Sequence, residues 1–323
     1  MTAYYLYDEG EEGLIHAIEV TNIIKENHNS PYQRIDVLDT KKFGRILILD
    51  NVIQFSEVYE HIYHESIVHP ALLMHPCPKK ILVLGGGDGG AIREIMKYQS
   101  VESVTMVELD QEVISISKEY LPKLSANAFD DKRLTLHIND AEKFIAETTE
   151  TFDVIISDIT DCTGETTKLY TKEFFESVSS KLDKDGIFVC HTWPPDDSDN
   201  FPIINNTLST VFPRIRQASM FIPEYFWDFV FIFCFKKDQP LLSIEEIDQR
   251  LRTRNVRELK FIDGSAYQRI FTLPKGMRDA MQKKTRLSTN DHPFALHRSM
   301  KYIPQKIVTL DMIHNKHPSE ETT

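Results

Sequence analysis

The sequence predicts an α/β protein in which an open, mostly parallel sheet follows a β-rich N-terminal segment. Three observations lead to this prediction. From residue 79 onward, short apolar strands alternate with segments of helical spacing, which is the pattern of parallel βαβ units. A glycine-rich turn, Gly85–Gly90, joins the first of these strands to a helix. Before residue 75, apolar and polar residues alternate as they do in antiparallel strands.

The N-terminal segment contains several strands and one helix. Apolar and polar residues alternate in Ile15–Lys25 and again in Gln33–Thr40. Arg45–Phe55 has the pattern of a hairpin, with Asp50 and Asn51 at its tip. Glu60–Met74 has helical spacing, and the prolines that follow end this helix and lead into the central strand.

The glycine-rich turn is the most informative motif. Ile81–Leu84 is a short apolar run, typical of a buried parallel strand, and Ala91–Tyr98 has helical spacing. The intervening glycines (Gly85, Gly86, Gly87, Gly89 and Gly90) permit a tight turn and a close approach of a ligand to the backbone. Nucleotides bind at such turns in open α/β sheets. Asp88 lies inside the turn and would repel a pyrophosphate, so we expect no phosphate cradle here.

An acidic residue completes this signature. Val104–Asp110 is predicted to be the next strand, and Glu108 stands at its carboxyl end, 20 residues after Asp88. An acidic residue at that spacing can accept hydrogen bonds from ribose hydroxyls. The alternative is a tight turn without a ligand. The order of a strand, a helix and a second strand that ends in an acidic residue favours a nucleoside-type ligand instead.

The alternation continues through the rest of the chain. Further strands are predicted at Leu134–Ile138, Phe152–Ser157 and Gly186–Cys190, with helices at Gln111–Tyr120, Ala141–Glu147, Thr171–Leu182 and Ile203–Val211. The last two strands, Arg214–Ile222 and Phe229–Phe235, are expected to pair antiparallel, and the segment after Pro240 is helical and charged.

Acidic residues follow the predicted strands at one edge of the sheet. Asp88, Glu108, Asp140 and Asp158 each stand at a strand's carboxyl end, and Asp161 follows within one turn. In an open parallel sheet these ends share one crevice. A single aspartate there, such as Asp140, can equally be a helix N-cap. Five carboxylates without a phosphate-binding loop favour a positively charged ligand, such as a sulfonium or an amine.

Composition excludes several classes of protein. The chain has 323 residues and a net charge of -12, which argues against a general nucleic-acid binder and is compatible with a cationic substrate. No apolar run reaches the roughly 20 residues of a membrane span, and no secretory signal is evident. The four cysteines are far apart, which predicts free thiols in the cytoplasm and no metal site.

Several motifs together resemble one known family. They are Ile53-Gln54, Tyr63-His64-Glu65, Gly85–Gly90 with Arg93-Glu94, Val101–Val104, Ser117–Pro122, Asp158-Ile-Thr-Asp161, Leu169–Phe174, Ile222-Pro223 with Tyr225, and Phe271–Pro274. Over roughly residues 4–280 the chain thereby resembles the polyamine aminopropyltransferases, of which spermidine synthase is the type.

The resemblance implies a domain organisation. It implies a small N-terminal β-domain, residues 1–76, and a Rossmann-like, seven-stranded methyltransferase domain, residues 77–285. Residues 286–323 form a C-terminal extension of unknown role. Members of the family usually form homodimers or larger assemblies, so a homodimer or tetramer is expected, without a nucleic-acid or membrane partner.

The resemblance also implies a reaction. Decarboxylated S-adenosylmethionine would be the co-substrate that donates an aminopropyl group to an amine, with methylthioadenosine as the leaving group and no permanently bound cofactor. An amine is mostly protonated at neutral pH, so a desolvated carboxylate must accept a proton before the nitrogen can attack. A carboxylate on ordinary S-adenosylmethionine placed near Asp88 would be repelled, which would favour the decarboxylated donor.

Individual roles carry over position by position. Asp158 matches the catalytic base, oriented by Tyr63. Glu108 would bind the ribose hydroxyls, Asp140 the adenine amino group, and Asp88 the amine of the aminopropyl arm. The other positions that match the donor site are Gln33, Gln54, His64 and the glycines Gly85, Gly86 and Gly87; those that match the acceptor side are Asp161 and Tyr225.

The sequence departs from the family pattern mainly on the acceptor side. His191 replaces a glutamine, Glu165–Thr167 replaces Pro-Ala-Glu, and Phe226–Asp228 replaces Pro-Ser-Gly. These changes leave the acceptor open among putrescine and other diamines or polyamines. His191 would contact the acceptor or satisfy a buried carbonyl. Trp193, with Phe226 and Trp227, would line an acceptor channel or belong to a lid or core.

Two other functions compete with aminopropyl transfer. The same fold can use intact S-adenosylmethionine, either as an amine N-methyltransferase or as an aminocarboxypropyltransferase. The third hypothesis is a non-catalytic polyamine or nucleoside sensor. Asp158 and Asp161 argue against a sensor, because binding alone needs no base beside the donor.

Overall fold

The computed structural model describes residues 4–11, 14–162, 164–192, 200–295 and 306–309. The chain divides into two compact units, one of residues 1–60 with 297–323 and the other of residues 61–296. The predicted boundaries at residues 76 and 285 stay predictions. Trp193 lies outside the described residues.

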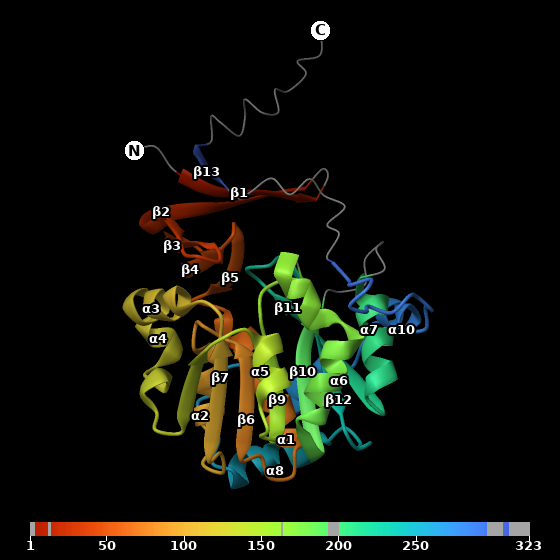
Figure 1. The fold of residues 1–323 in the computed structure, drawn as a ribbon. Helices are drawn as coiled ribbons and strands as arrows, with labels where there is room; N and C mark the ends of the chain where they lie inside the picture. The colour runs from red at the N-terminus through yellow and green to blue at the C-terminus, as the bar shows by residue number, and fades with distance from the viewer. Residues whose placement is uncertain (1–3, 12–13, 163, 193–199, 296–305, 310–323) are drawn as a thin grey trace. The chain divides into compact units, whose positions relative to one another are not determined.

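The first unit is a six-stranded antiparallel sheet with the strand order β13-β1-β2-β3-β4-β5 (Figure 1). Asp50 and Asn51 both have positive φ, 46° and 68°, as a two-residue hairpin turn requires, so the predicted hairpin is confirmed. The strands are β1 (Tyr4–Glu11), β2 (Leu14–Asn29), β3 (Arg34–Thr40), β4 (Gly44–Leu49), β5 (Val52–Ser56) and, from the C-terminal region, β13 (Lys306–Thr309).

The second unit has a seven-stranded sheet with the order β11-β12-β10-β9-β6-β7-β8. Strands β6 to β10 are parallel to one another, β12 is antiparallel to β10, and β11 is antiparallel to β12, as predicted for the last two strands. The strands are β6 (Lys80–Gly85), β7 (Ser103–Glu108), β8 (Leu134–Ile138), β9 (Phe152–Asp158), β10 (Leu182–Thr192), β11 (Arg214–Ile222) and β12 (Trp227–Phe235).

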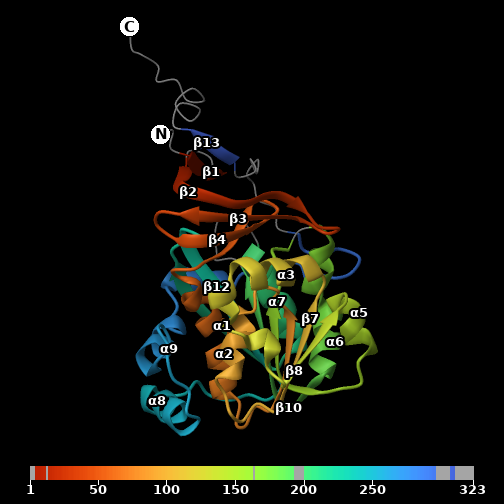
Figure 2. The ribbon, with the colours of Figure 1, turned by 90° about the vertical axis from the view of Figure 1, so that its left-hand side faces the viewer.

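Helices cover both faces of this sheet (Figure 2). Successive strand residues point to opposite faces, so Ile81 and Val83 pack in one core and Leu82 and Leu84 in the other. The helices are α1 (Glu60–Met74), α2 (Gly90–Met96), α3 (Gln111–Tyr120), α4 (Pro122–Ser125), α5 (Ala141–Glu147), α6 (Lys172–Ser180), α7 (Asn200–Val211), α8 (Ile244–Thr253), α9 (Gly264–Ile270) and α10 (Lys275–Ala280).

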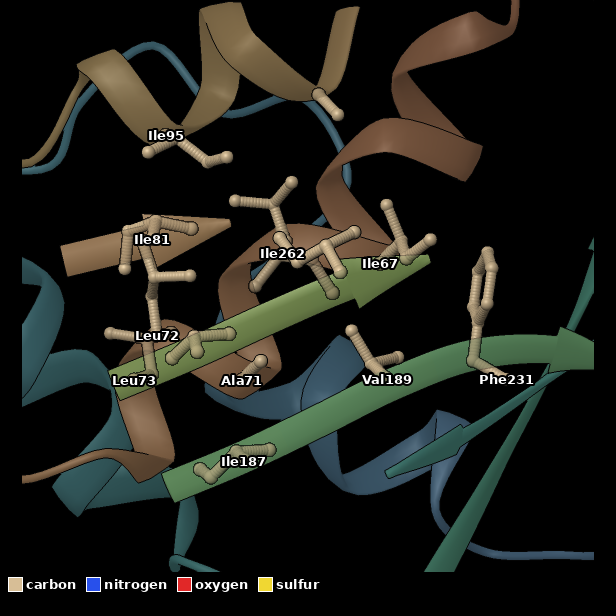
Figure 3. Close-up of a cluster of buried hydrophobic side chains, with 14 of the residues drawn as sticks. Ile67, Ala71, Leu72, Leu73, Ile81, Ile95, Ile187, Val189, Phe231 and Ile262 are labelled. Atoms are coloured by element: carbon tan, nitrogen blue, oxygen red, sulfur yellow. The ribbon is translucent and has the colours of Figure 1, made fainter. Parts of the chain in front are cut away.

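The first core fixes α1 against the sheet. Ile67, Ala71 and Leu72 of α1 are fully buried and pack with Val189 and Phe231 of the sheet (Figure 3). Burying a side chain of the size of Ile67 or Leu72 stabilises a fold by about 1.5–3 kcal/mol. The first turn of α1, which carries Tyr63 and His64, is therefore anchored to the sheet. In the described residues no helix is both long and apolar enough to cross a membrane.

Candidate active site

The glycine-rich turn crosses directly over the end of β9. Gly86 N–H donates to the Asp158 carbonyl oxygen at 2.8 Å, and a Cβ on Gly85 would lie 2.1 Å from that same oxygen. Gly85 and Gly86 also have positive φ, 82° and 76°, which other residues adopt only with strain. A Cβ on Gly87 would lie 2.9 Å from Glu108 Oε2. The glycines thus bring the backbone into contact with both acidic strand ends.

Asp158 and Tyr63 form the centre of the site. Tyr63 Oη–H donates to Asp158 Oδ1 at 2.8 Å. The other carboxylate oxygen, Oδ2, is buried and has no hydrogen-bond partner among the described residues. Burial, and then the charge of Asp88, raise the pKa of Asp158 to about 6, against the opposing effects of His64 and Tyr63. Asp158 therefore has one oxygen oriented by Tyr63 and one buried oxygen whose hydrogen-bonding capacity the described residues leave unused.

His64 and Asp88 lie beside this carboxylate. His64 Nε2 is 3.4 Å from Asp88 Oδ2, while Asp88 Oδ1 accepts from Gly90 N–H at 2.7 Å. One ligand atom from each of His64, Asp88 and Asp158 lies within 4.8 Å of the others. This spacing suits a bound cation, either a metal ion or an ammonium group. The predicted absence of a metal stays a prediction.

A second cluster of this kind lies at the opposite, amino-terminal edge of the sheet. It consists of His75, Asp153 and Asp183, with His75 Nε2 at 3.9 Å from Asp183 Oδ1. Cys77 N–H donates to His75 Nδ1 at 3.3 Å, which assigns the proton of the neutral ring to Nε2. Because a metal needs the lone pair at Nε2, this hydrogen bond disfavours a metal there.

A buried ionic network holds α1 against α2. His69 of α1 contacts Tyr98 Oη at 2.9 Å through Nδ1 and Glu94 Oε2 at 2.8 Å through Nε2. Burial by itself raises the pKa of Glu94, but the hydrogen bond with His69 and the charges of Arg93 and Lys97 outweigh it and hold the pKa well below its usual range. The network joins the helix that carries Tyr63 to the helix that follows the glycine-rich turn.

The side chains predicted to contact a nucleoside stand at the ends of β7 and β8. Glu108 Oε1 accepts from Asp110 N–H at 2.9 Å, and burial is the main cause that raises the pKa of Glu108 to about 7. Asp140 is exposed, and its Oδ1 accepts from Lys143 N–H at 2.9 Å, so it caps α5. The cap was the alternative reading of Asp140, and its adenine contact stays a prediction.

Two apolar residues here were not anticipated from the sequence. Leu109, which follows the buried strand β7, is 39% exposed, and Ile138, the last residue of β8, is 46% exposed. Ile138 pairs in register with Glu108. Exposed apolar side chains beside Glu108, the carboxylate predicted to bind the ribose, are suited to contact a flat base. Their signal in the sequence is an apolar residue adjacent to the acid at a strand end.

On the predicted acceptor side, Asp161 acts electrostatically on three neighbours. Burial is the main cause that holds the pKa of Tyr170 and Tyr225 well above its usual range, and the charge of Asp161 adds to it; at His191 that charge opposes the effect of burial. His191 is buried, contacts Tyr170 Oη through Nε2 at 3.0 Å, and has a pKa lowered to about 4 by burial. It is therefore neutral at physiological pH, and its partner is a phenol rather than the carbonyl that the alternative reading supposed.

An aromatic wall runs from Tyr63 to His191. The ring of Phe229 lies 5.6 Å from Tyr63, 5.4 Å from Tyr225 and 5.3 Å from His191. Sequence reasoning gave Phe229 no role in the site, because its alternation within β12 resembles that of an ordinary core residue. Phe226 is 37% exposed with φ 65°, which places it in a turn rather than in a core.

The site is negatively charged. Burial and the charges of Glu224, Asp158, Asp88 and Asp161 hold the pKa of Tyr225 well above its usual range. Glu224 is only 2% exposed and was also missed by sequence reasoning. In the described part of the chain, the pKa shifts of Asp158, Glu108 and Tyr225 arise mainly from burial, hydrogen bonds and other acidic groups, and not from a lysine or an arginine. Such a site favours a cation.

Gln33 and Gln54 belong to the first unit. Gln33 N–H donates to Ser30 Oγ at 3.0 Å, and Gln54 Nε2 donates to the Val52 carbonyl at 3.2 Å. Both are half-buried. Their contacts with the donor stay predictions.

Comparisons with family models match nearly all of the first 246 residues. Residues 60–246 match the spermine/spermidine synthase domain, and residues 6–57 match the spermidine synthase tetramerisation domain.

Curated relatives are similar over most of the chain. A polyamine aminopropyltransferase of Sulfurisphaera tokodaii is 38% identical over 284 residues, which cover 87% of this chain and 94% of the relative. That of Saccharolobus solfataricus is 39% identical over 271 residues, 82% of this chain and 89% of the relative.

Solved structures are similar in fold. A spermidine synthase in complex with the transition-state analogue AdoDATO superposes with a TM-score of 0.79 at 31% identity, over 86% of this chain and 94% of that chain. The spermidine synthase of Thermotoga maritima has a TM-score of 0.76 at 30% identity, over 86% and 93%.

Proposed function

The chain belongs to the spermine/spermidine synthase family and is an aminopropyltransferase, and from this premise we propose that it transfers the aminopropyl group of decarboxylated S-adenosylmethionine to a diamine or polyamine. The observation that carries the proposal is the environment of Asp158. One carboxylate oxygen is oriented by Tyr63, and the other is buried and available to a ligand.

The reaction needs a base, and Asp158 supplies it. The ammonium group of the acceptor donates its proton to Asp158 Oδ2. The freed nitrogen lone pair then attacks the carbon next to the sulfonium, the C–S bond breaks, and its electron pair stays on sulfur, so methylthioadenosine leaves uncharged. A pKa of about 6 keeps Asp158 ionised at neutral pH and still makes it a better proton acceptor than an ordinary aspartate.

The donor is bound by groups at the adjoining strand ends. Glu108 accepts hydrogen bonds from the ribose hydroxyls, and Leu109 and Ile138 contact the adenine. Asp88 binds the ammonium group of the aminopropyl arm, beside His64. Its charge disfavours the carboxylate of ordinary S-adenosylmethionine, which supports the decarboxylated form as co-substrate.

The acceptor carries a second cationic nitrogen. Asp161 and Glu224 provide negative charge around Tyr225 in addition to that of Asp158 and Asp88. A monoamine, once deprotonated for attack, would leave that charge unneutralised, whereas a diamine or polyamine keeps an ammonium there. The carbon chain between the two nitrogens would lie along the aromatic wall of Tyr63, Phe229 and His191. We also expect a homodimer or tetramer, because residues 6–57 match a tetramerisation domain.

The base assignment is tested with Asp158→Asn. We expect unchanged donor affinity by isothermal titration and a loss of turnover of about 100-fold or more, since general-base catalysis contributes roughly 10²–10⁴-fold. Asp153→Asn, at the other end of the same strand, is the matched control and should keep its turnover. Turnover in Asp158→Asn equal to that of the control would remove Asp158 as the base.

The donor and acceptor are tested by mass analysis of the product. The wild-type enzyme receives each of the two donors with a panel of monoamines, diamines and polyamines. The proposal expects an aminopropyl gain on diamines or polyamines, with methylthioadenosine release. A methyl or aminocarboxypropyl gain, or equal turnover of monoamines, would contradict it.

A further inference from the structure

The C-terminal extension contributes one strand to the sheet of the first unit. Strand β13 pairs antiparallel with β1 along Tyr4–Tyr7, where Tyr4 is opposite Thr309 and Tyr7 is opposite Lys306 (Figure 1). It lies beyond the residues that either family model matches. Without β13, strand β1 would be the edge of the sheet.

The edge that β13 covers is the half of β1 with no protection of its own. Tyr4–Tyr7 is uncharged and rich in aromatic residues, which favour strand pairing. The other half, Asp8–Glu11, carries three acidic residues and an irregularity in its pairing with β2. Charges and bulges are the usual protection of an exposed edge against pairing with another chain. β13 therefore covers the stretch of β1 that could otherwise pair with a strand of another chain.

The register continues a row of apolar residues. Ile307 is opposite Leu6, and Leu6 is opposite Ile18 on the next strand. Leu6 and Ile18 are 3% and 6% exposed. The β13 segment, Lys-Ile-Val-Thr, has the β-branched composition of a strand. Its pairing is thus specified by sequence pattern as well as by position.

We propose that β13 caps the β1 edge within its own chain, and that the partner it excludes is a second copy of this chain. Two copies of Tyr4–Tyr7 can pair antiparallel about a two-fold axis, as symmetric dimers do. That arrangement places the acidic half of each β1 beyond the paired stretch, whereas parallel pairing would set the acids opposite one another. The proposal is independent of the chemistry assigned to the active site.

The test compares the full chain with two truncations. Residues 1–309 keep β13, and residues 1–305 lack it. Light scattering after size-exclusion chromatography should give 1–309 the assembly of the full chain. It should give 1–305 a species of at least about twice that mass, because the uncovered edges pair. An unchanged mass for 1–305 would overturn the proposal. A smaller mass would also overturn it, because β13 would then build the assembly instead of limiting it.

Two further variants separate edge pairing from unfolding. Ile307→Pro with Val308→Pro, in the full chain, removes two backbone donors from β13 and should reproduce the larger species, while Ser319→Pro, beyond the strand, is its control. Tyr5→Lys in residues 1–305 places a charge on the uncovered edge and should restore the mass of the full chain. If Tyr5→Lys leaves the larger species intact, the association does not run through this edge and the proposal fails.

Discussion

At the residue scale, the carboxylates of the site differ in their environment, and the fold raises the pKa of some of them. Asp158 and Glu108 are half-buried at strand ends, and loss of solvation is the main cause that raises their pKa to about 6 and about 7. Asp140 is exposed and acts as a helix cap. Aspartates and glutamates that look alike in the sequence therefore have different chemistry, because solvation differs between them.

The pH dependence of turnover follows from Asp158. The base must be ionised, so kcat/KM should rise with pH through about 6. A pH profile with a saturating donor measures this limb. Asp158→Asn should abolish it, whereas Asp153→Asn should retain it. A wild-type profile that is flat between pH 5 and 7 would contradict the assignment.

The raised pKa of Asp158 also predicts that replacing this residue by asparagine stabilises the folded protein at alkaline pH. The folded-state pKa of Asp158 lies above the ordinary aspartate value of 3.8, so protonation favours the fold. This contribution to stability is present below about pH 4 and is lost as the pH rises through about 6. Asp158→Asn should therefore stabilise the protein at pH 8 by up to about 3 kcal/mol and have little effect near pH 4. Urea unfolding at both pH values measures the difference, and an equal effect at both would refute it.

Asp88 should determine which donor binds. In Asp88→Asn the ammonium of the decarboxylated donor loses a charged partner, so its affinity should fall by about ten- to a hundredfold. Ordinary S-adenosylmethionine should bind better than it does to the wild-type enzyme, because the repulsion is removed. Titration of both donors into this variant and into the exposed control Glu147→Gln checks the outcome. A parallel loss for both donors would indicate a structural role.

At the scale of elements, the site is made by the close approach of β6, α1 and β9. The glycine-rich turn leaves no space for side chains against β9 and α1, and the network of His69 and Glu94 holds α1 to α2. The alignment of Tyr63 with Asp158 depends on this packing, since the two residues are 95 positions apart in the chain.

Gly90→Ala tests this close approach. A Cβ at residue 90 would lie 2.3 Å from the His64 ring, so the ring must move away from residue 90 and its present distance of 3.4 Å from Asp88 would change. We expect a loss of about 1–3 kcal/mol in the free energy of unfolding, together with weaker donor binding. Gly276→Ala is the matched control, because nothing lies within 4 Å of its Cβ. Wild-type donor affinity in Gly90→Ala would show that the contact with His64 is dispensable.

At the scale of the whole molecule, net charge and assembly matter. The chain carries a net charge of -12, and the site itself is anionic. The field of the protein should therefore draw cationic substrates toward the site. β13 acts at the same scale, because a strand of the first unit is proposed to set how many copies associate.

Salt should weaken the capture of the amine. Raising the ionic strength from about 20 to about 300 mM shortens the screening length severalfold, so kcat/KM for the acceptor should fall by about two- to tenfold. kcat at saturating amine should change much less, because the bound state is screened less than the encounter. Initial-rate assays at a series of salt concentrations measure kcat/KM and kcat, and a neutral osmolyte in place of salt is the control. A kcat/KM independent of salt would exclude steering.

The sequence alone determined the second sheet, the hairpin at Asp50 and the acidic edge of the site. These features depend on local signals, namely apolar alternation, turn residues, and glycines between strand and helix. Each such signal is contained within a short stretch of the sequence. The family resemblance and the enzyme class followed from the same motifs and are confirmed.

Only the tertiary structure decided how the acids differ and what completes each unit. The hydrogen bond from Tyr63 to Asp158, the wall around Phe229 and the pairing of β13 with β1 all join residues far apart in the chain. Solvation and close packing depend on which residues the rest of the fold places around a side chain. The periodicity of the sequence does not predict those neighbours.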